Sequence, residues 1–425
     1  MEGLNITDII WDSSNFVLDL KENKDLIKLS NKNEFSEKTP RPSKALVDIK
    51  QYKQLLEIKE KISNCIHWDK WSRLINPYDK IQYLAKNKNT KDYYKYFEIL
   101  KYFNITRDSP EMGSSAHIGE SSIHSAKALS YFLPKINWYV GLEKHNNEIR
   151  KNINKSQIEL NKLAETDLEK NTDENGYSRL IYSDNELTVV ENLNNFRKTV
   201  GKVNIVIGDC TTDTSHDPNN QEQLVFYLLF AQIVTALQMQ LLDGHIIIKI
   251  YDTITRPTCQ LIYYLSNFYE YVSIIKPRTS RYTNSEKFIV AKKFKGIHDD
   301  ELKLLSKILA NWNPDHYFRV MGVDIPEEIE MQFLTYNKML IENQYNYIEK
   351  TIKCNYNEEE IPDKQLDAFQ NKNAQLFCSN FGIPINLSDS DISICKHIKK
   401  KKIQIGHLKN SMVCEKCFTL LIGKS

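Results

Sequence analysis

The sequence has 425 residues, of which 41% are hydrophobic and 11% aromatic, and this composition excludes a fully disordered chain. Its 57 Lys and Arg residues nearly balance 55 Asp and Glu residues, so the formal net charge of +2 argues against a protein that coats nucleic acid through bulk charge. No window approaches the roughly 18 consecutive apolar residues of a membrane span, and no signal-peptide pattern is present, so we expect a soluble protein without a membrane partner.

The first part of the chain, residues 1–63, mixes polar residues with short apolar clusters and contains a helix-like stretch that ends near Ile62. We interpret it as an N-terminal extension. Aromatic content then rises, and a helix is predicted over Asp92–Tyr102, because its apolar residues recur at spacings of three and four. That pattern predicts the buried face of the helix: Tyr93, Tyr96, Phe97 and Leu100.

Short apolar runs then alternate with longer amphipathic ones. Strands are predicted at Ala116–Gly119, Trp138–Leu142, Val203–Gly208, His245–Tyr251, Tyr271–Ile275 and Lys287–Ala291. Helices are predicted at Ser125–Leu133, Gln221–Leu242 and Pro257–Asn267. The runs VNIVIG and HIIIKIY are typical of strands buried on both faces of a parallel sheet. This alternation predicts an α/β fold, a Rossmann-like doubly wound sheet over residues 64–296, with a polar surface insertion at about 150–178.

A helical C-terminal region is predicted from residue 297 to 425, with helices at Asp299–Leu309 and Pro326–Ile352 and a Lys-rich tail. The tail contains one CxxC pair and further Cys and His residues, which makes it a candidate zinc site: Cys395, His407, Cys414 and Cys417. The spacing fits no standard zinc finger, so a tail without metal is the favoured alternative. The eight cysteines are scattered along the chain, which favours a reducing compartment.

Two charged residues of opposite sign follow the predicted central strands. Lys249 lies inside the apolar run IIIKIY, where an ammonium group is costly to bury without a partner, and Asp209 comes directly after VNIVIG. Ligands of open α/β sheets bind at the carboxyl ends of the strands, so we expect the two residues to share a site. The structural alternatives are a lysine that extends from a sheet edge to solvent and an aspartate that caps a turn.

Two further charges complete a family pattern. Glu286 immediately precedes the last predicted strand, and Lys95 lies within an aromatic helix; alone, either is an ordinary turn or surface residue. Together, the segments YKYFEI, VNIVIGD, IIIKI and KPRTSRYTNSE resemble, in this order, those of the FtsJ-like ribose 2′-O-methyltransferases. The Lys-Asp-Lys-Glu tetrad of that family falls on Lys95, Asp209, Lys249 and Glu286.

Two other segments resemble the versions of this family that large cytoplasmic DNA viruses encode. They are NPYD at residues 76–79 and HIGESSIHSAKALSYFL at residues 117–133. The resemblance implies a viral protein that acts in the host cytoplasm or is packaged in the virion, with viral capping or transcription proteins as partners.

The resemblance also implies an activity: methyl transfer from S-adenosyl-L-methionine to a ribose 2′-hydroxyl of RNA, with capped mRNA as the expected substrate. The family assigns removal of the hydroxyl proton to the lysine that matches Lys249. Lowering a lysine pKa from about 10.4 to about 7 or 8 costs on the order of 4 kcal/mol. Burial and Lys95 favour this shift, whereas the two acids oppose it, so we expect Asp209 and Glu286 to orient Lys249 and the hydroxyl.

Cofactor contacts are expected from the ends of the first strands: Gly119, Glu120, Ser121, Ser122, Glu143, Glu186 and Asp209. Glu143 ends a predicted strand, where this fold commonly places an acid on ribose hydroxyls, and Glu186 resembles the acidic position of the family beside the adenine. Relatives carry an Ala-Pro-Gly-Gly-like turn after the first strand, and alignment places Ser-Ser-Ile-His, residues 121–124, there instead. This difference keeps an alternative open: a catalytically inactive methyltransferase-fold protein that serves as an RNA-binding or assembly module.

RNA contacts are expected from Arg278 and Arg281, which lie just upstream of Glu286, because RNA binding requires cations for phosphates and aromatic faces for stacking. The segment that precedes Lys95 contains further candidates: Trp68, Trp71, Arg73 and Tyr78. For the aromatic ones, packing in the core is the favoured interpretation.

Overall fold

The computed structural model describes residues 45–86, 89–108, 113–119, 122–141, 179–182, 190–211, 214, 217–311, 323–356 and 363–385. The α-helices are α1 Ile49–Glu60, α2 Trp68–Leu74, α3 Ile81–Leu84, α4 Lys91–Tyr102, α5 Ile105–Asp108, α6 Ser122–Phe132, α8 Val190–Val200, α9 Gln221–Met239, α10 Arg256–Leu265, α11 Asp299–Ala310, α12 Glu327–Tyr356 and α13 Asp363–Phe381. The strands are β1 Ser114–Gly119, β2 Asn137–Gly141, β3 Arg179–Tyr182, β4 Val203–Asp209, β5 Gln240–Ile250, β6 Tyr269–Ile275 and β7 Lys287–Phe294. Short 3₁₀ helices cover Lys61–Asn64 and Pro218–Asn220.

The described strands form one sheet in the order β3-β2-β1-β4-β5-β7-β6. Strands β1 to β5 run parallel to one another, and β7 is antiparallel to both β5 and β6. From β1 the chain builds outward to β3 and then returns to place β4 on the other side of β1. The strand order therefore reverses between β1 and β4, which creates the crevice where doubly wound sheets bind ligands. The predicted Rossmann-like doubly wound α/β fold is confirmed.

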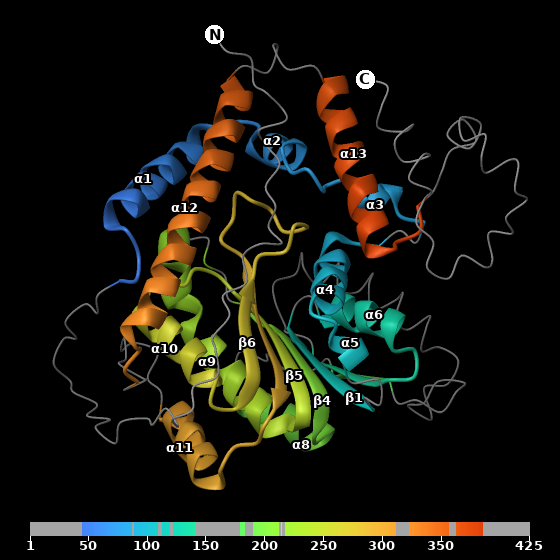
Figure 1. Cartoon of the computed structure of the whole chain (residues 1–425), viewed down its shortest axis with the longest axis vertical. Coiled ribbons are helices and arrows are strands. Elements are labelled where there is room, and N and C mark those ends of the chain that lie inside the picture. Colours follow the sequence, from blue (N-terminus) through green and yellow to red (C-terminus); the bar gives the residue numbers. More distant parts are fainter. Residues whose placement is uncertain are drawn as a thin grey trace, which may run out of the picture.

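Helices cover both faces of the sheet (Figure 1), with α9 and α10 on one side and α4 and α6 on the other. The central strands alternate accordingly: Val206 and Ile248 pack in the core beneath α9, whereas Ile207 and Ile247 pack against α4 and α6. All four side chains are buried. This two-sided burial explains why the runs VNIVIG and HIIIKIY are almost wholly apolar.

Helix α9 is the most apolar helix of this core. By length and composition alone it passes as a membrane span, but 72% of the relevant window is buried inside the fold, as is typical for the core helix of a soluble protein. The helix was predicted to continue to Leu242, and this was wrong because β5 already begins at Gln240. The buried Gln240 side chain donates from Nε2 to the Asn204 carbonyl of β4, 2.7 Å away, and so ties the chain to the sheet at that point.

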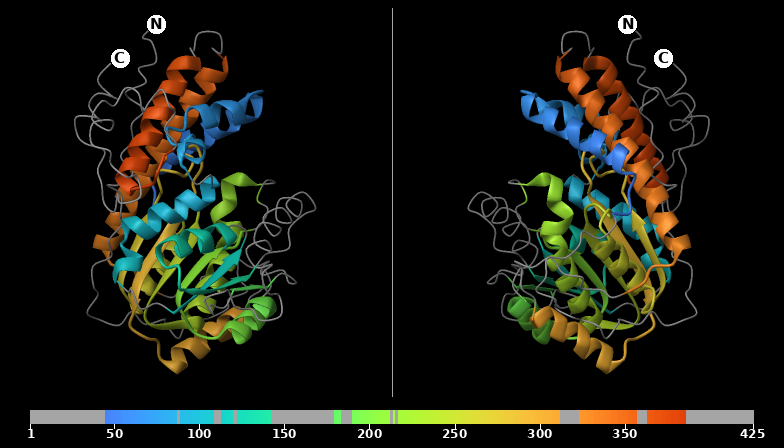
Figure 2. Two further views of the ribbon diagram at one scale, coloured as in Figure 1. Left: turned by 90° about the vertical axis from the view of Figure 1, so that its right-hand side faces the viewer. Right: turned by 90° about the vertical axis from the view of Figure 1, so that its left-hand side faces the viewer.

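A further layer of helices, here named the helical cap, consists of α1, α2, α12 and α13 and lies beyond one end of the sheet (Figure 2). Leu55 of α1 packs with Ile348 of α12, and Trp71 of α2 packs with Phe369 of α13. The cap thus joins segments from both ends of the described chain. Helices α2, α3, α5, α8 and α13 and strand β3 were not predicted from the sequence.

Asn337 of α12 fastens the helical cap to the sheet domain. Its buried Nδ2 donates to the carbonyls of Leu46 and Thr253, both at 2.7 Å, and its Oδ1 accepts from the Thr253 hydroxyl at 2.6 Å. Because Thr253 follows β5, one side chain links the segment before α1, the end of a central strand and α12. The side-chain amide of Asn337 and the hydroxyl of Thr253 are thus paired, as is usual for buried polar groups.

Candidate active site

Two of the predicted site residues lie at the carboxyl ends of neighbouring parallel strands. Asp209 is the last residue of β4, and Lys249 is the penultimate residue of β5. Because Gly208 pairs with Ile248, the two side chains start from adjacent positions, and they form an ion pair. Only 9% of the Lys249 side chain and 3% of the Asp209 side chain are exposed. The structure therefore gives the buried lysine the partner that its burial requires.

The other two predicted residues form a second ion pair beside the first. Lys95 projects from α4, and its Nζ lies 2.8 Å from Oε1 and 3.0 Å from Oε2 of Glu286, the residue before β7. The Ser280 hydroxyl donates to Glu286 Oε1 at 2.8 Å. Asp92, one turn earlier on α4, accepts from Lys95 Nζ at 2.9 Å and is a member of the cluster that the sequence did not reveal.

The charges of the cluster stabilise one another. Burial alone would lower the pKa of Lys249, but the surrounding negative charges, above all that of Asp209, raise it well above its usual range. Burial likewise opposes the charge on Lys95, yet Glu286 and Asp92 raise its pKa. Although burial works against ionised carboxyls, the lysines lower the pKa of Glu286 and hold that of Asp92 at about 2. The expected lowering of the Lys249 pKa is therefore absent, because the acids outweigh burial.

Tyr96 is a residue of this site that sequence reasoning assigned only to the core. Its ring is buried edge-on against Phe288, with 5.5 Å between ring centroids, and its hydroxyl donates to Asp209 Oδ2 at 3.0 Å. Consecutive residues of α4 thus serve the two acids: Lys95 pairs with Glu286, and Tyr96 bonds to Asp209. The sequence signal for this role was a tyrosine next to Lys95, but the partner of that tyrosine, Asp209, is 113 residues away in the chain.

Glu98, also on α4, holds the β6–β7 loop, which is defined here as residues 276–286. Its carboxylate accepts from the backbone amides of Arg278 and Thr279, at 2.9 and 3.2 Å, and from the Thr279 hydroxyl at 2.9 Å. Burial raises the pKa of Glu98 to about 7, against the effect of these donors. Both predicted RNA-binding arginines, Arg278 and Arg281, belong to this loop, and α4 holds the backbone of the first of them.

The part of the site where we predicted cofactor contacts is built from backbone. Gly119, the last residue of β1, pairs in register with Asp209 of β4 at the point where the strand order reverses. It has a positive φ of 107°, and a Cβ added there would lie 2.4 Å from the carbonyl carbon of Asp209. Only glycine fits such a position without strain.

The other predicted cofactor residues are placed only in part. Ile123 and His124 lie in α6, which begins at Ser122, and Gly119 is the nearby described position whose backbone requires glycine. The remaining predicted contacts lie outside the described residues: Glu120, Ser121, Glu143 and Glu186.

The remaining candidates divide into core residues and residues outside the described ranges. Trp71 is fully buried, and Trp68 packs in the cluster between α1 and α12, so both serve the core, whereas Arg73 is exposed on α2. The candidate zinc residues lie beyond the described part of the chain: Cys395, His407, Cys414 and Cys417. Among the residues that are described, no group of three or more His, Cys, Asp or Glu side chains is placed to hold a metal ion.

Comparison with known proteins agrees with this arrangement. Residues 90–294 match the model of the family described as FtsJ-like methyltransferase, and the match includes all four members of the tetrad. This segment is an FtsJ-like methyltransferase domain. The resemblance predicted from the four sequence segments is therefore confirmed for about half of the chain.

The FtsJ-like domain has relatives in animals and in a virus. The cap-specific mRNA (nucleoside-2'-O-)-methyltransferase 2 of Drosophila melanogaster is 29% identical over 156 residues, which are 36% of this chain and 22% of the relative. The cap-specific mRNA (nucleoside-2'-O-)-methyltransferase 1 of Mus musculus is 37% identical over 136 residues, 31% of this chain and 16% of the relative. The "Probable methyltransferase EP424R" of African swine fever virus (strain Badajoz 1971 Vero-adapted) is 29% identical over 186 residues, 39% of this chain and 43% of the relative.

The chain thus matches less than half the length of each of these relatives. Among solved structures, human methyltransferase-like protein 13 in complex with SAH is similar at 9% identity with a TM-score of 0.30, over 54% of this chain and 96% of that chain.

Proposed function

We propose that the FtsJ-like domain transfers a methyl group from S-adenosyl-L-methionine to a ribose 2′-hydroxyl of RNA, and that its substrate is capped mRNA. The observation that carries this proposal is the meeting of Lys95, Asp209, Lys249 and Glu286 at the carboxyl end of the sheet. The names of the animal relatives, both cap-specific mRNA 2'-O-methyltransferases, support the choice of capped RNA.

The tetrad is suited to hold a hydroxyl group and to control its proton. The Lys249 ammonium donates a hydrogen bond to the ribose 2′-oxygen, while Asp209 fixes the direction of the amine. Lys249 accepts the hydroxyl proton only as a neutral amine. Because the acids raise the pKa of Lys249, most of its amine is protonated at neutral pH. The neutral fraction grows as the pH rises, so we expect the methyl-transfer rate to increase from neutral into alkaline pH.

The residues present also fit the cofactor. S-adenosyl-L-methionine would supply the methyl group on a positively charged sulfonium. Gly119 at the end of β1 and the start of α6 at Ser122 would hold it in the crevice between β1 and β4.

Titration calorimetry of the full chain with S-adenosyl-L-methionine separates this proposal from the alternative of an inactive RNA-binding or assembly module. The difference that favours the alternative is Ser-Ser-Ile-His at residues 121–124, where relatives carry a glycine-rich turn. We expect heat of binding from the cofactor. Absence of binding at millimolar cofactor would contradict the enzyme proposal and favour the inactive module.

The catalytic assignment is tested with Lys249→Ala. We expect methyl transfer to capped RNA to fall by a factor of about 10³, within the range of general acid–base contributions, with cofactor affinity unchanged. Lys293→Ala is the control, because Lys293 forms an exposed ion pair with Glu270 on the sheet. Activity retained in Lys249→Ala would remove this residue from the mechanism.

We also propose that the protein acts in the cytoplasm of an infected host cell or within the virion, together with viral capping or transcription proteins. The similarity to the African swine fever virus protein supports a viral setting. Fractionation of infected cells and purified virions with an antibody against the chain tests the proposal, and a nuclear protein absent from virions would contradict it.

A further inference from the structure

The β6–β7 loop is unusually well covered for a loop that carries site residues. It contributes Glu286 to the tetrad, yet the side chains of Lys276, Thr279, Ser280 and Tyr282 are also buried. Connecting segments normally run over the surface and are mobile. Some neighbouring element must therefore enclose this loop and set its conformation.

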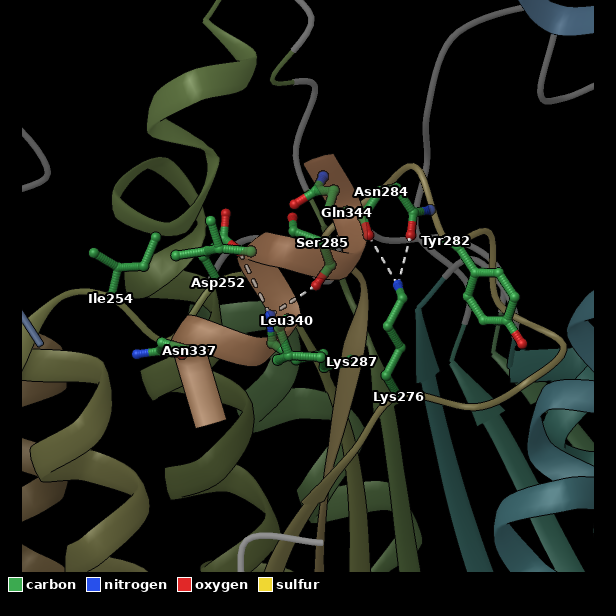
Figure 3. A pocket seen from close by; sticks show the side chains of 11 residues that line it. Asp252, Ile254, Lys276, Tyr282, Asn284, Ser285, Lys287, Asn337, Leu340 and Gln344 are labelled. Carbon is green, nitrogen blue, oxygen red and sulfur yellow. Dashed lines mark hydrogen bonds and ion pairs between the residues drawn. The ribbon is translucent and has the colours of Figure 1, made fainter. Parts of the chain in front are cut away.

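The inner side of the loop is held from within the FtsJ-like domain. Glu98 of α4 binds the backbone at Arg278 and Thr279, as described above. At the other end, Lys276 Nζ donates to the carbonyl and Oδ1 of Asn284, at 2.8 and 3.1 Å (Figure 3). It also donates to the carbonyl of Glu286 at 3.0 Å. These bonds close the loop on itself but leave its outer turn, around Thr283, to another partner.

That partner is α12 of the helical cap. Gln344 Nε2 donates to the Thr283 carbonyl at 2.9 Å, and its side chain lies over the loop beside Asn284 (Figure 3). One turn further along α12, the Tyr347 ring packs against the Tyr282 ring with 4.6 Å between centroids. Both α12 residues are buried. They lie well beyond residue 294, where the match to the FtsJ-like family ends.

We propose that Gln344 and Tyr347 are positioning residues, and that α12 completes the active site by holding the β6–β7 loop so that Glu286 reaches Lys95. The proposal rests on the methyltransferase function proposed above and adds a role for a helix outside the family match. Glu286, which forms the ion pair with Lys95, follows Thr283 by only three residues in the chain. A displaced Thr283 therefore moves the tetrad acid.

Variants of α12 test the proposal through kinetics. Gln344→Met keeps the size of the side chain and removes its donor, and Tyr347→Leu removes the ring contact. Because a misplacement of about 1 Å costs up to about 100-fold in rate, we expect kcat on capped RNA to fall by roughly 10- to 100-fold. Affinity for S-adenosyl-L-methionine is expected to stay unchanged, because the crevice at Gly119 does not involve α12.

The matched control is Lys353→Met on the same helix. Lys353 forms an exposed ion pair with Glu349, and we expect wild-type kinetics. If Gln344→Met does not fold, as judged by circular dichroism, Gln344→Asn serves instead, because it keeps the amide but withdraws it from Thr283. Wild-type kcat in the folded Gln344 variants would overturn the proposal.

A double-mutant cycle distinguishes positioning from a general loss of stability. If Gln344 acts through Glu286, then Gln344→Met has little further effect on kcat in an enzyme that already carries Glu286→Gln. Independent effects that multiply in the double variant would overturn the proposal.

Trypsin cleavage after Arg278 and Arg281 provides a measurement that needs no activity. We expect the loop of Gln344→Met to be cut faster than that of the wild type and of Lys353→Met, under conditions where all three are folded. Equal cleavage rates would overturn the proposal. If the wild type transfers no methyl group but the cleavage difference is present, the proposed function fails while the hold of α12 on the loop stands.

Discussion

The two sides of the site are built from different materials. The side proposed to be catalytic, here called the catalytic side, lies at the ends of β4 and β5 and the start of β7, and it consists of two ion pairs, Lys249 with Asp209 and Lys95 with Glu286. The side proposed to bind the cofactor, here called the cofactor side, lies at the end of β1 and depends on the backbone of Gly119 and on the absence of a side chain there. The difference shows that a site made of charged side chains can be recognised in a sequence from its residue types, whereas a site made of backbone leaves only a glycine to recognise.

The largest effect is expected from a change on the cofactor side. Gly119→Ala places a methyl group 2.4 Å from the Asp209 carbonyl carbon at a φ of 107°, so β1 and β4 must separate. We expect cofactor affinity to fall by about 100-fold or more and the free energy of unfolding to fall by at least ~1 to 3 kcal/mol. Calorimetry and thermal melts measure both quantities.

The control for this variant is Gly113→Ala, just before β1. An added Cβ there meets only Asn204 Oδ1, 3.9 Å away, so affinity and stability should match the wild type. Wild-type cofactor affinity in Gly119→Ala would contradict the view that the cofactor side is a backbone site.

A second prediction concerns the pH dependence of the free energy of unfolding, which should involve Glu98 beside the catalytic side and not Gly119 on the cofactor side. The pKa of Glu98 is about 7 in the folded protein against 4.5 for an ordinary glutamate, so between these values the folded chain keeps a proton that the unfolded chain releases. The resulting stabilisation is complete below pH 4.5 and is lost as the pH rises to 7, by about 3 kcal/mol in all.

Glu98→Gln removes this contribution, so its free energy of unfolding should lack that part of the fall between pH 4.5 and 7. Gly119→Ala should keep the slope of the wild type. Denaturant titrations at a series of pH values provide the comparison. Equal slopes for Glu98→Gln and the wild type would show that Glu98 is not the group that titrates.

The smallest effect is expected from Tyr96→Phe, which removes the hydrogen bond to Asp209 and leaves the ring in place. A hydrogen bond to a charged group contributes about 1.5 to 3 kcal/mol, so kcat should fall by roughly tenfold or more with unchanged cofactor affinity. Tyr93→Phe is the control on the same helix, where the Tyr93 ring packs against Tyr94 and Phe97. Equal activities of the two variants would mean that Asp209 needs no support from α4.

The sequence was sufficient for the central strands and for Lys249 and Asp209, because a lysine within IIIKIY and an aspartate after VNIVIG are exceptions to an apolar pattern. Lys95 and Glu286 were assigned only through the resemblance to the FtsJ-like family. The sequence was insufficient for Tyr96 and Glu98, which look like ordinary members of a helix and meet their partners only through tertiary contacts. Their partners Asp209 and Thr279 lie 113 and 181 residues further along the chain.

Other differences arose where local pattern and tertiary structure diverge. Helix α13 was not predicted, because its buried residues, among them Phe369 and Phe377, are separated by many polar ones. The end of α9 was placed too late because Leu241 and Leu242 look like core residues; both are exposed at the start of β5. In each case, contacts with distant segments decide the local structure.

The junction at Asn337 has a consequence for the order in which the molecule matures. Leu46 and Thr253 are synthesised long before residue 337. Their carbonyls therefore lack the hydrogen bonds from Asn337 until that residue has been added to the chain. Chains grow from the N-terminus, and their segments acquire structure in that order. The sheet therefore emerges first, and the junction that fastens α12 to it forms only after residue 337 has been synthesised.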